Sequence, residues 1–341
     1  MNSMERLQCL MAGAMADRRM FTLPLSLYGA GLTGCPLEQY YNDPSAYARG
    51  QAAVRETFQP DVLFGPLVVA ALAEAFGSRV RYTDKVAPTV SAPAIGSAAE
   101  WGRLPIPDPD RHPRLRYLRE ALRRVVAEQG GEVPIAAVLV PPIDLPGLVM
   151  GLDGWVETLV FDRPAAEAIM KRLIPFAVAM ANRCFEDGAT FVVWTVMFAS
   201  PGFVTPDIMA SFSRPVLAEA LAQVRGPVVL HHLEYPLLPY LDRFAGLPAV
   251  AGFGLAQTDD LGEARRILGA EPVLLSGPSA QWLRGVPTTE VEAACRSFLV
   301  DRRDDPRFIL ASSKADVLID TPPENIHAFR AAVEAFAEAR R

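Results

Sequence analysis

The sequence predicts an α/β fold, a single (β/α)8 TIM barrel domain over residues 1–341 with an N-terminal helical elaboration. Three observations support this prediction. Eight short apolar runs, each bounded by turn residues, alternate with amphipathic helical segments. No stretch between these segments resembles an interdomain linker. The runner-up, a doubly wound sheet, is disfavoured because no Gly-x-Gly-x-x-Gly follows the first strand.

The predicted strands are short apolar runs that end at glycine, proline or a polar turn. Gly29 breaks the first run, Gly65 with Pro66 closes the second, and Pro141 with Pro142 stops the third. In chain order the predicted strands are 21–28, 61–64, 135–140, 190–196, 228–231, 249–254, 273–276 and 308–312.

The predicted helices show apolar residues three and four positions apart, as Leu7, Leu10, Met11 and Met15 do near the N-terminus. The segment 79–95 differs, because it alternates apolar and polar residues and contains two prolines; we expect a hairpin or an excursion outside the main sheet. In chain order the predicted helices are 3–16, 46–58, 67–76, 114–129, 144–151, 153–160, 164–187, 205–224, 235–244, 261–268, 279–283, 289–301 and 323–339.

Composition excludes several classes of protein. Half of the residues are hydrophobic, which allows a sizeable core, and the formal net charge of −6 provides no basic footprint for nucleic acid. The four cysteines are too few and too scattered for a disulfide framework. Near the N-terminus the basic residues follow the apolar part, the reverse of a signal peptide, and no apolar run approaches the roughly 20 residues of a spanning helix. We therefore expect a cytoplasmic protein that does not enter the membrane.

The stretch from Val228 to Tyr240 is the strongest candidate for a functional site. Its apolar strand ends in His231 and His232, and Glu234 follows two residues later. The chain has only four histidines, so half of them lie here. In a barrel the active site lies at the carboxyl ends of the strands, which is where this stretch belongs. His231 and Glu234 are therefore catalytic candidates and tentative metal ligands.

The ends of the other strands supply the remaining candidates. Tyr28 and Asp316 close strands, and we expect both in the mouth as catalytic residues. Lys314 could supply charge for an anionic group, although an exposed lysine is the ordinary interpretation. The mouth otherwise has an apolar character, which suits a large or hydrophobic ligand or one carried by another protein. The expected cofactor-binding residues are Met197, Phe198, Phe253 and Ser276, although a Met197–Phe198 pair is more often part of a core than of a pocket.

The order of motifs resembles the uroporphyrinogen decarboxylase superfamily, and within it the cobalamin (corrinoid)-dependent methyltransferases. The most specific match is Asp320-Thr-Pro-Pro-Glu-Asn-Ile326, placed after a strand. We expect Glu324 and Asn325 to cap the helix that begins there. The resemblance covers nearly the whole chain and implies a (β/α)8 barrel. The other matching segments are Tyr41-Asn-Asp-Pro44, Ala73-Glu-Ala-Phe-Gly77, Gly188-Ala-Thr-Phe-Val192, Leu230-His231, 258–268 and 285–291.

The family's decarboxylases use arginines after strand one and an aspartate after strand two to hold a porphyrinogen. Here 28–33 contains no arginine and 64–67 contains no carboxylate. A tetrapyrrole with many carboxylate groups requires cationic partners. The departure from the family pattern argues against decarboxylation of uroporphyrinogen.

The family's methyltransferases bind zinc through a His-x-Cys pair after strand five and a cysteine after strand eight. His231 matches the histidine, but Leu233 stands at the first cysteine position and Lys314 or Ala315 at the second. Two outcomes remain open. One is a rebuilt zinc centre with His231, Glu234 and either His232 or Asp316 as ligands. The other is a metal-free pocket in which His231 is a hydrogen-bond donor or general base.

The leading hypothesis is a methyltransferase of the corrinoid type. It would move a methyl group between a small methylated substrate or a thiol and cobalamin held on a partner corrinoid protein. Because the thiolate ligands are missing, an O- or N-methyl donor is favoured. The alternatives are a non-catalytic binding member of the superfamily and a decarboxylase of a smaller acid. The sequence does not fix the oligomeric state.

Overall fold

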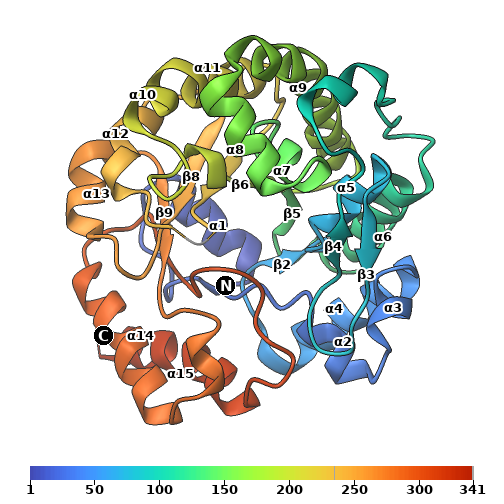
Figure 1. Cartoon of the computed structure of the whole chain (residues 1–341). Helices are drawn as coiled ribbons and strands as arrows, with labels where there is room; N and C mark the ends of the chain where they lie inside the picture. Colours follow the sequence, from blue (N-terminus) through green and yellow to red (C-terminus); the bar gives the residue numbers. More distant parts are fainter. Residues whose placement is uncertain (234, 340–341) are drawn as a thin grey trace.

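A computed structural model describes residues 1–233 and 235–339 and contains an eight-stranded parallel sheet (Figure 1). The strand order is β1-β10-β9-β8-β7-β6-β5-β2, so from β5 to β10 each strand pairs with the next strand along the chain. The strands are β1 Phe21–Thr22, β2 Leu63–Phe64, β5 Ile135–Leu139, β6 Phe191–Thr195, β7 Val228–His231, β8 Val250–Gly254, β9 Val273–Ser276 and β10 Phe308–Ala311. The predicted (β/α)8 barrel is confirmed.

Helices surround this sheet on the outside, as Figure 1 shows. The α-helices are α1 Ser3–Met11, α2 Tyr28–Thr33, α3 Leu37–Tyr40, α4 Pro44–Phe58, α5 Ala70–Ala75, α6 Pro113–Gln129, α7 Leu145–Val149, α8 Leu152–Phe161, α9 Arg163–Glu186, α10 Pro206–Ile208, α11 Arg214–Leu221, α12 Leu241–Phe244, α13 Leu261–Leu268, α14 Thr288–Asp301 and α15 Pro323–Glu338. Shorter turns are η1 Ala98–Arg103, η2 Met197–Ala199, η3 Met209–Ser213 (a π-helix), η4 Leu238–Tyr240 and η5 Trp282–Arg284.

The barrel interior is filled by the side chains that alternate inward along each strand. On β7, Val229 packs in the interior cluster, whereas Val228 and Leu230 belong to the core between strands and helices. Leu10 of α1 joins the same interior cluster, so α1 covers the amino-terminal end of the barrel. The interior cluster consists of Leu10, Met20, Val62, Phe64, Ala136, Val193, Val229, Val273 and Ile309.

The buried carboxylate of Asp61 joins β1, β2 and α1. The backbone N–H of Asp61 donates to the carbonyl oxygen of Phe21 at 2.9 Å, which closes the sheet between β1 and β2. Its side chain accepts hydrogen bonds from the Phe21 N–H at 3.0 Å and the Ser3 hydroxyl at 2.8 Å. Arg6 and Arg18 pair with the same carboxylate at 3.3 and 2.6 Å. Helix α1 is thereby fastened to the seam of the barrel.

Several predicted elements differ in extent from the observed ones. The first strand ends at Thr22 rather than at residue 28, because Pro24 has no N–H to donate to the sheet and the chain departs there. The predicted helix 205–224 is interrupted by the π-turn at 209–213, just before Pro215, whose missing N–H cannot bond one turn back. The expected hairpin within 79–95 is confirmed as β3 Arg79–Arg81 and β4 Thr89–Ala92, a separate antiparallel pair.

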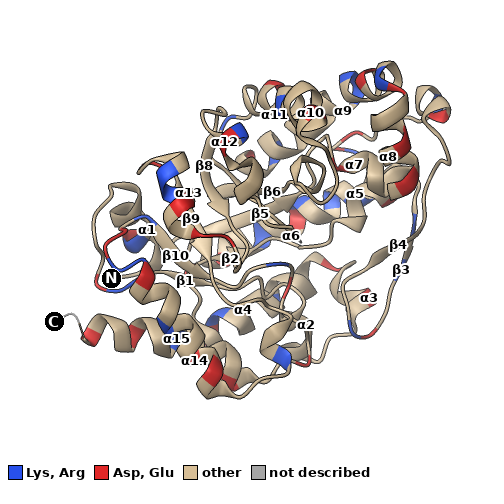
Figure 2. Cartoon of the chain, turned by 60° about the vertical axis from the view of Figure 1, so that its left-hand side comes forward, with Lys and Arg blue, Asp and Glu red and all other residues tan. Residues whose placement is uncertain are grey.

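Charged residues lie mainly on the outer helices and loops, with both signs interspersed (Figure 2). Within the described part of the chain, no helix is both long enough and apolar enough to cross a membrane.

Replacing Asp61 by Asn should lower the free energy of unfolding by about 3–5 kcal/mol, because two arginines then lose their buried counter-charge. Chemical denaturation followed by circular dichroism measures this change. Asp17→Asn is the matched control. Asp17 also pairs with Arg6, but its side chain is one-third exposed, so the cost should be no more than about 1 kcal/mol. Equal effects of the two substitutions would contradict the role given to Asp61.

Candidate functional site

A cavity of about 180 Å³ lies inside the barrel and opens at the carboxyl ends of the strands. Its deeper walls are aliphatic and aromatic, with Val193, Val229 and Leu275 among them. Polar groups are confined to strand ends and to the segment after β10. These polar lining residues are Thr22, Thr195, His231, Ser312, Ser313 and Lys314. The cavity therefore suits a small ligand with an apolar body.

His231 faces this cavity because it alternates with Val229 along β7, and both side chains line the wall. The neighbouring strand makes room for the imidazole. A Cβ atom on Gly254 would lie 2.4 Å from Cδ2 of His231, so any larger residue there would displace the ring. On the other side Thr195 is the register partner of His231. The prediction that His231 stands at the mouth agrees with this placement.

A hydrogen bond fixes which nitrogen of His231 carries the proton. Nδ1 accepts from the Leu233 N–H at 3.0 Å, so Nδ1 is unprotonated and the proton of the neutral ring lies on Nε2. Burial lowers the pKa of His231 to about 4, which keeps the ring neutral at pH 7. His231 is therefore a hydrogen-bond donor through Nε2. It is not a general base in this arrangement, because neither nitrogen has a lone pair free.

His232 turns away from the cavity and holds the adjacent loop. Its ring stacks on that of His231 with centroids 4.8 Å apart, and its Nε2 accepts from the backbone N–H of Lys314 at 3.2 Å. Burial, with smaller effects of His231 and Lys314, lowers the pKa of His232 to about 2. Leu233 and Lys314 both have positive φ angles, 57° and 70°, which non-glycine residues rarely adopt. His231 thus stabilises the strained backbone of Leu233, and His232 stabilises that of Lys314.

Asp316 and Tyr28 do not have the positions predicted for them, since neither side chain lines the cavity. The Asp316 carboxylate is buried and accepts a hydrogen bond from the Leu27 N–H at 2.7 Å, so it braces the loop after β1; burial raises its pKa well above the usual value. The Tyr28 hydroxyl donates to the Thr321 carbonyl at 2.8 Å. Tyr28 begins α2, because the first strand ends six residues earlier than predicted.

Two further buried aspartates brace loops in the same way as Asp316. Asp144, after β5, accepts from the N–H groups of Met197 and Phe198 at 2.7 and 2.8 Å. Burial raises the pKa of Asp144 to about 7. Asp259 accepts from Leu237, Leu238 and Ala256 N–H groups. These carboxylates hold neighbouring loops together at the mouth rather than facing a ligand.

The residues predicted to bind a cofactor also lie outside the cavity lining. Phe198 and Phe253 are buried with almost no exposed surface; Phe198 stacks edge-on against Trp155 and Phe253 against Phe244 of α12. Alternation explains Phe253, because Gly252 and Gly254 occupy the inward positions of β8. The Ser276 hydroxyl donates to the carbonyls of Leu255 and Ala256. Met197 is half-buried in the turn after β6.

Asn325 has a different structural role from the helix cap expected of it. Its Nδ2 donates to the carbonyls of Leu283 and Val286, and its Oδ1 accepts from the Thr288 hydroxyl. The N-cap residue of α15, Pro322, makes no side-chain capping hydrogen bond. The Asp320–Ile326 motif therefore ties the loop after β9 to the last helix.

Sequence reasoning missed Thr195 as part of the site, and it placed Gly254, Ser312 and Ser313 in strand-end segments without giving them a role. The alternation of inward and outward residues contains the signal for two of these four. Counting from His231 across the aligned strand ends would have selected Thr195 and Gly254 as neighbours.

The described residues do not fit a zinc ion at this site. Among them, no three His, Cys, Asp or Glu side chains gather as a metal cluster. His231 has Nδ1 engaged with Leu233 and a proton on Nε2, so neither nitrogen is ready to coordinate a metal. Asp316 is committed to Leu27. The predicted ligand Glu234 lies outside the described residues.

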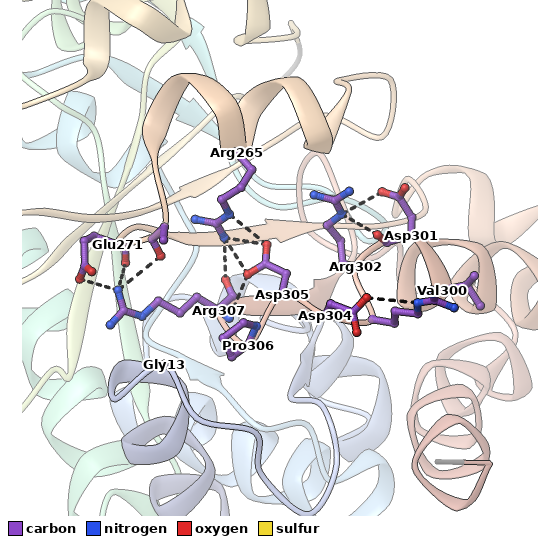
Figure 3. Close-up of a pocket in the computed structure, with 12 residues that line it drawn as sticks. Gly13, Arg265, Glu271, Val300, Asp301, Arg302, Asp304, Asp305, Pro306 and Arg307 are labelled. Carbon is purple, nitrogen blue, oxygen red and sulfur yellow. Dashed lines mark hydrogen bonds and ion pairs between the residues drawn. The ribbon is translucent and has the colours of Figure 1, made fainter.

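A larger cavity, of about 780 Å³, lies at the loops that lead into β9 and β10 (Figure 3). Its arginines are paired with carboxylates, for example Arg265 with Asp305 at 2.8 Å and Arg307 with Glu271 at 2.5 Å. This cavity is at the amino-terminal face of the barrel, where barrels carry stability rather than chemistry. We therefore place the functional site at the smaller, apolar cavity.

Comparisons with known proteins agree with the fold. The model of the protein family described as Uroporphyrinogen decarboxylase (URO-D) matches residues 2–336. A methyltransferase from Methanosarcina mazei has a similar structure, with a TM-score of 0.87, 20% sequence identity, and coverage of 98% of this chain and 99% of that chain. A B12-independent methionine synthase from a Shewanella species has a TM-score of 0.53 at 12% identity, covering 89% and 90% of the two chains. A comparison with curated protein sequences found no match.

Replacing His231 by Asn should reduce the loss of stability between pH 7 and pH 5. An unfolded histidine takes up a proton near pH 6.5, whereas folded His231 does so only near pH 4. Between these values the unfolded state binds more protons, so stability falls as the pH falls. Asn removes this titration, and its Oδ1 can still accept from Leu233. Denaturation midpoints at pH 7 and pH 5 measure the effect, and His327→Asn, at an exposed histidine, is the control. If the wild type and the His231→Asn variant lose the same stability between these pH values, the prediction is wrong.

Proposed function

Because the chain belongs to the uroporphyrinogen decarboxylase family, we propose that it is a methyltransferase of the corrinoid-dependent type. It would take a methyl group from a small methylated molecule in the barrel cavity and pass it to cobalamin carried by a partner corrinoid protein. We include a cytoplasmic location in this proposal, since the four cysteines are free thiols.

The observation that carries this proposal is the apolar cavity with a neutral donor, His231, at its rim. Among the described lining residues, Lys314 is the single cationic side chain. A porphyrinogen would need several cations for its carboxylates, so the family's decarboxylation reaction is disfavoured. The likeness to the Methanosarcina mazei methyltransferase is compatible with methyl transfer.

The size of the cavity bears on where a corrinoid would bind. About 180 Å³ is close to the 150 Å³ of an engineered protein cavity that binds benzene, and a corrin macrocycle is several times larger. The corrinoid would have to remain outside and face the mouth while the substrate occupies the interior. This arrangement fits a cofactor presented by another protein, and it leaves the small cavity to the methyl donor.

When bound, the corrinoid supplies a nucleophilic cobalt centre that accepts the methyl group. The protein's own contribution is to hold the donor in a site from which aliphatic walls exclude water. As the bond between the methyl carbon and its heteroatom breaks, the electron pair stays on the heteroatom. The Nε2–H of His231 stabilises that developing charge by a hydrogen bond and keeps its proton, as neutral imidazoles do elsewhere. Solvent protonates the product after release.

The test of this proposal mixes the protein with reduced cobalamin and a series of methoxyaromatics, methylamines and thioethers. Formation of the methylated corrinoid is followed by its absorption. Transfer from at least one donor supports the proposal. Binding of donors without transfer to cobalamin, free or protein-bound, would instead favour a non-catalytic binding member of the family.

Two substitutions of His231 should separate its two hydrogen bonds. Asn keeps an acceptor for the Leu233 N–H but has no donor at the Nε2 position, and it should lower kcat by about 100-fold or more. Gln places an N–H donor near Nε2 and should retain most of the rate. Steady-state methyl transfer measures both variants. Equal losses would contradict the role of Nε2–H in the reaction.

Metal removal gives an independent prediction. Because the described donors do not fit zinc, purified protein should contain less than one equivalent, and a chelator should leave methyl transfer unchanged. Elemental analysis and a rate measurement after chelation test this. One equivalent of zinc in the wild type that disappears in His231→Asn would overturn the metal-free assignment.

A further inference from the structure

Asp144 joins the loop after β5 to the turn after β6 at the mouth of the barrel. Its side chain is 3% exposed, and its two carboxylate oxygens accept from the N–H groups of Met197 and Phe198 at 2.7 and 2.8 Å. Trp155 of α8 packs edge-on against Phe198 and donates its Nε1–H to the carbonyl of Ile143, the residue before Asp144. The carboxylate is thus the polar centre of a buried contact between two loops.

The segment from Val196 to Phe203 also contacts the loop that follows β7. At its start, the Val196 N–H donates to the His231 carbonyl at 3.0 Å. At its end, the Phe203 ring lies between those of Phe198 and Tyr235, with centroids 5.0 and 5.3 Å apart. Contacts therefore run from the turn held by the carboxylate to both sides of the His231 position.

Among the described residues, no cation offsets the charge of the Asp144 carboxylate. Burial raises the pKa of Asp144 to about 7, and the two N–H groups counteract only part of that effect. None of the charged or titratable side chains on the elements around these loops contributes to this pKa. Those side chains are Glu74 of α5, Asp153 and Glu157 of α8, Arg163 of α9, Arg214 of α11 and His231 of β7. The protonation of Asp144 is therefore controlled by its exposure to water.

This dependence on water couples the contact to pH. If the contact opened, the Asp144 carboxyl would enter water and have an ordinary pKa of about 4. The closed contact has the raised pKa, so between about pH 4 and pH 7 the closed state binds more protons. Closure consequently becomes about tenfold more favourable for each unit by which the pH falls. Above pH 7 both states are ionised, and this group no longer alters the balance.

We propose that Asp144 is a proton-operated latch, which closes the contact between the β5 and β6 loops below pH 7 and thereby fixes the loop beside His231. Asp144 is a positioning residue, because it acts through these loops and does not line the cavity. The latch is independent of the proposed methyl transfer, since it operates on the mouth of the barrel whatever the cavity binds.

Hydrogen exchange of the full chain without any ligand tests the latch. Mass spectrometry measures it, with a correction for the intrinsic pH dependence of exchange. In the wild type, the protection of residues 196–204 should rise about tenfold per pH unit from pH 7 to pH 5 and stay constant above pH 7. Asp144→Asn has no titrating group at this position and should remove the dependence.

Asp162→Asn is the matched control, because exposed Asp162 also accepts a backbone N–H, that of Ala165 at 3.1 Å. It should keep the wild-type profile. If Asp144→Asn does not fold, the wild type still decides, since constant protection of 196–204 between pH 7 and pH 5 would overturn the latch. A rise that persists in folded Asp144→Asn would overturn it as well.

The connection to the loop beside His231 has its own test. Asp144→Asn should change the pH profile of protection at residues 235–240 in the wild-type background. In a Phe203→Leu background the same substitution should leave that profile unchanged, because the ring between Phe198 and Tyr235 is missing. An equal change in both backgrounds would refute the transmission through Phe203.

Discussion

The closed end of the barrel depends on one buried carboxylate. Asp61 bonds the edge strands β1 and β2 to each other and holds α1 through Ser3 and Arg6. With α1 held there, Leu10 packs at the amino-terminal end of the interior, and the cavity lies toward the carboxyl ends of the strands. A polar network at one end therefore allows an apolar, water-poor site at the other, where a single hydrogen bond has a large effect.

At the open end, the buried polar groups divide into two kinds. Asp144, Asp259 and Asp316 accept hydrogen bonds from backbone N–H groups and connect the loops, so these side chains have a structural role. His231 lines the cavity with its proton on Nε2, and the hydroxyls of Ser312 and Ser313 have no hydrogen-bond partner among the described residues. The family's thiolate ligands are absent, and the histidine that remains is held in the tautomer that donates. The residues at the family's cysteine positions, Leu233 and Lys314 or Ala315, and the tautomer of His231 agree that the described residues do not fit a zinc ion.

Periodicity predicted the barrel and the location of His231, because both depend on local alternation of apolar residues. The errors came from interactions that a single sequence does not display. The orientation of the Asp316 side chain depends on a hydrogen bond from Leu27, almost 290 positions earlier. Tyr28 was assigned to a strand end, whereas the first strand ends early, before Pro24. Phe253 was assigned to the mouth because it lies near a strand end. Its side chain instead points outward from the barrel and packs against Phe244. The hydrogen bond that fixes the His231 tautomer was likewise invisible.

The protonation state of His231 is the central claim of this account, and nitrogen NMR of the imidazole measures it directly. The chain has four histidines, so His231→Asn assigns the signal by difference. We predict a neutral ring with the proton on Nε2 from pH 8 down to about pH 5, unchanged when zinc is added. A proton on Nδ1, a charged ring at pH 7, or a shift of the signal with one equivalent of zinc would contradict the account.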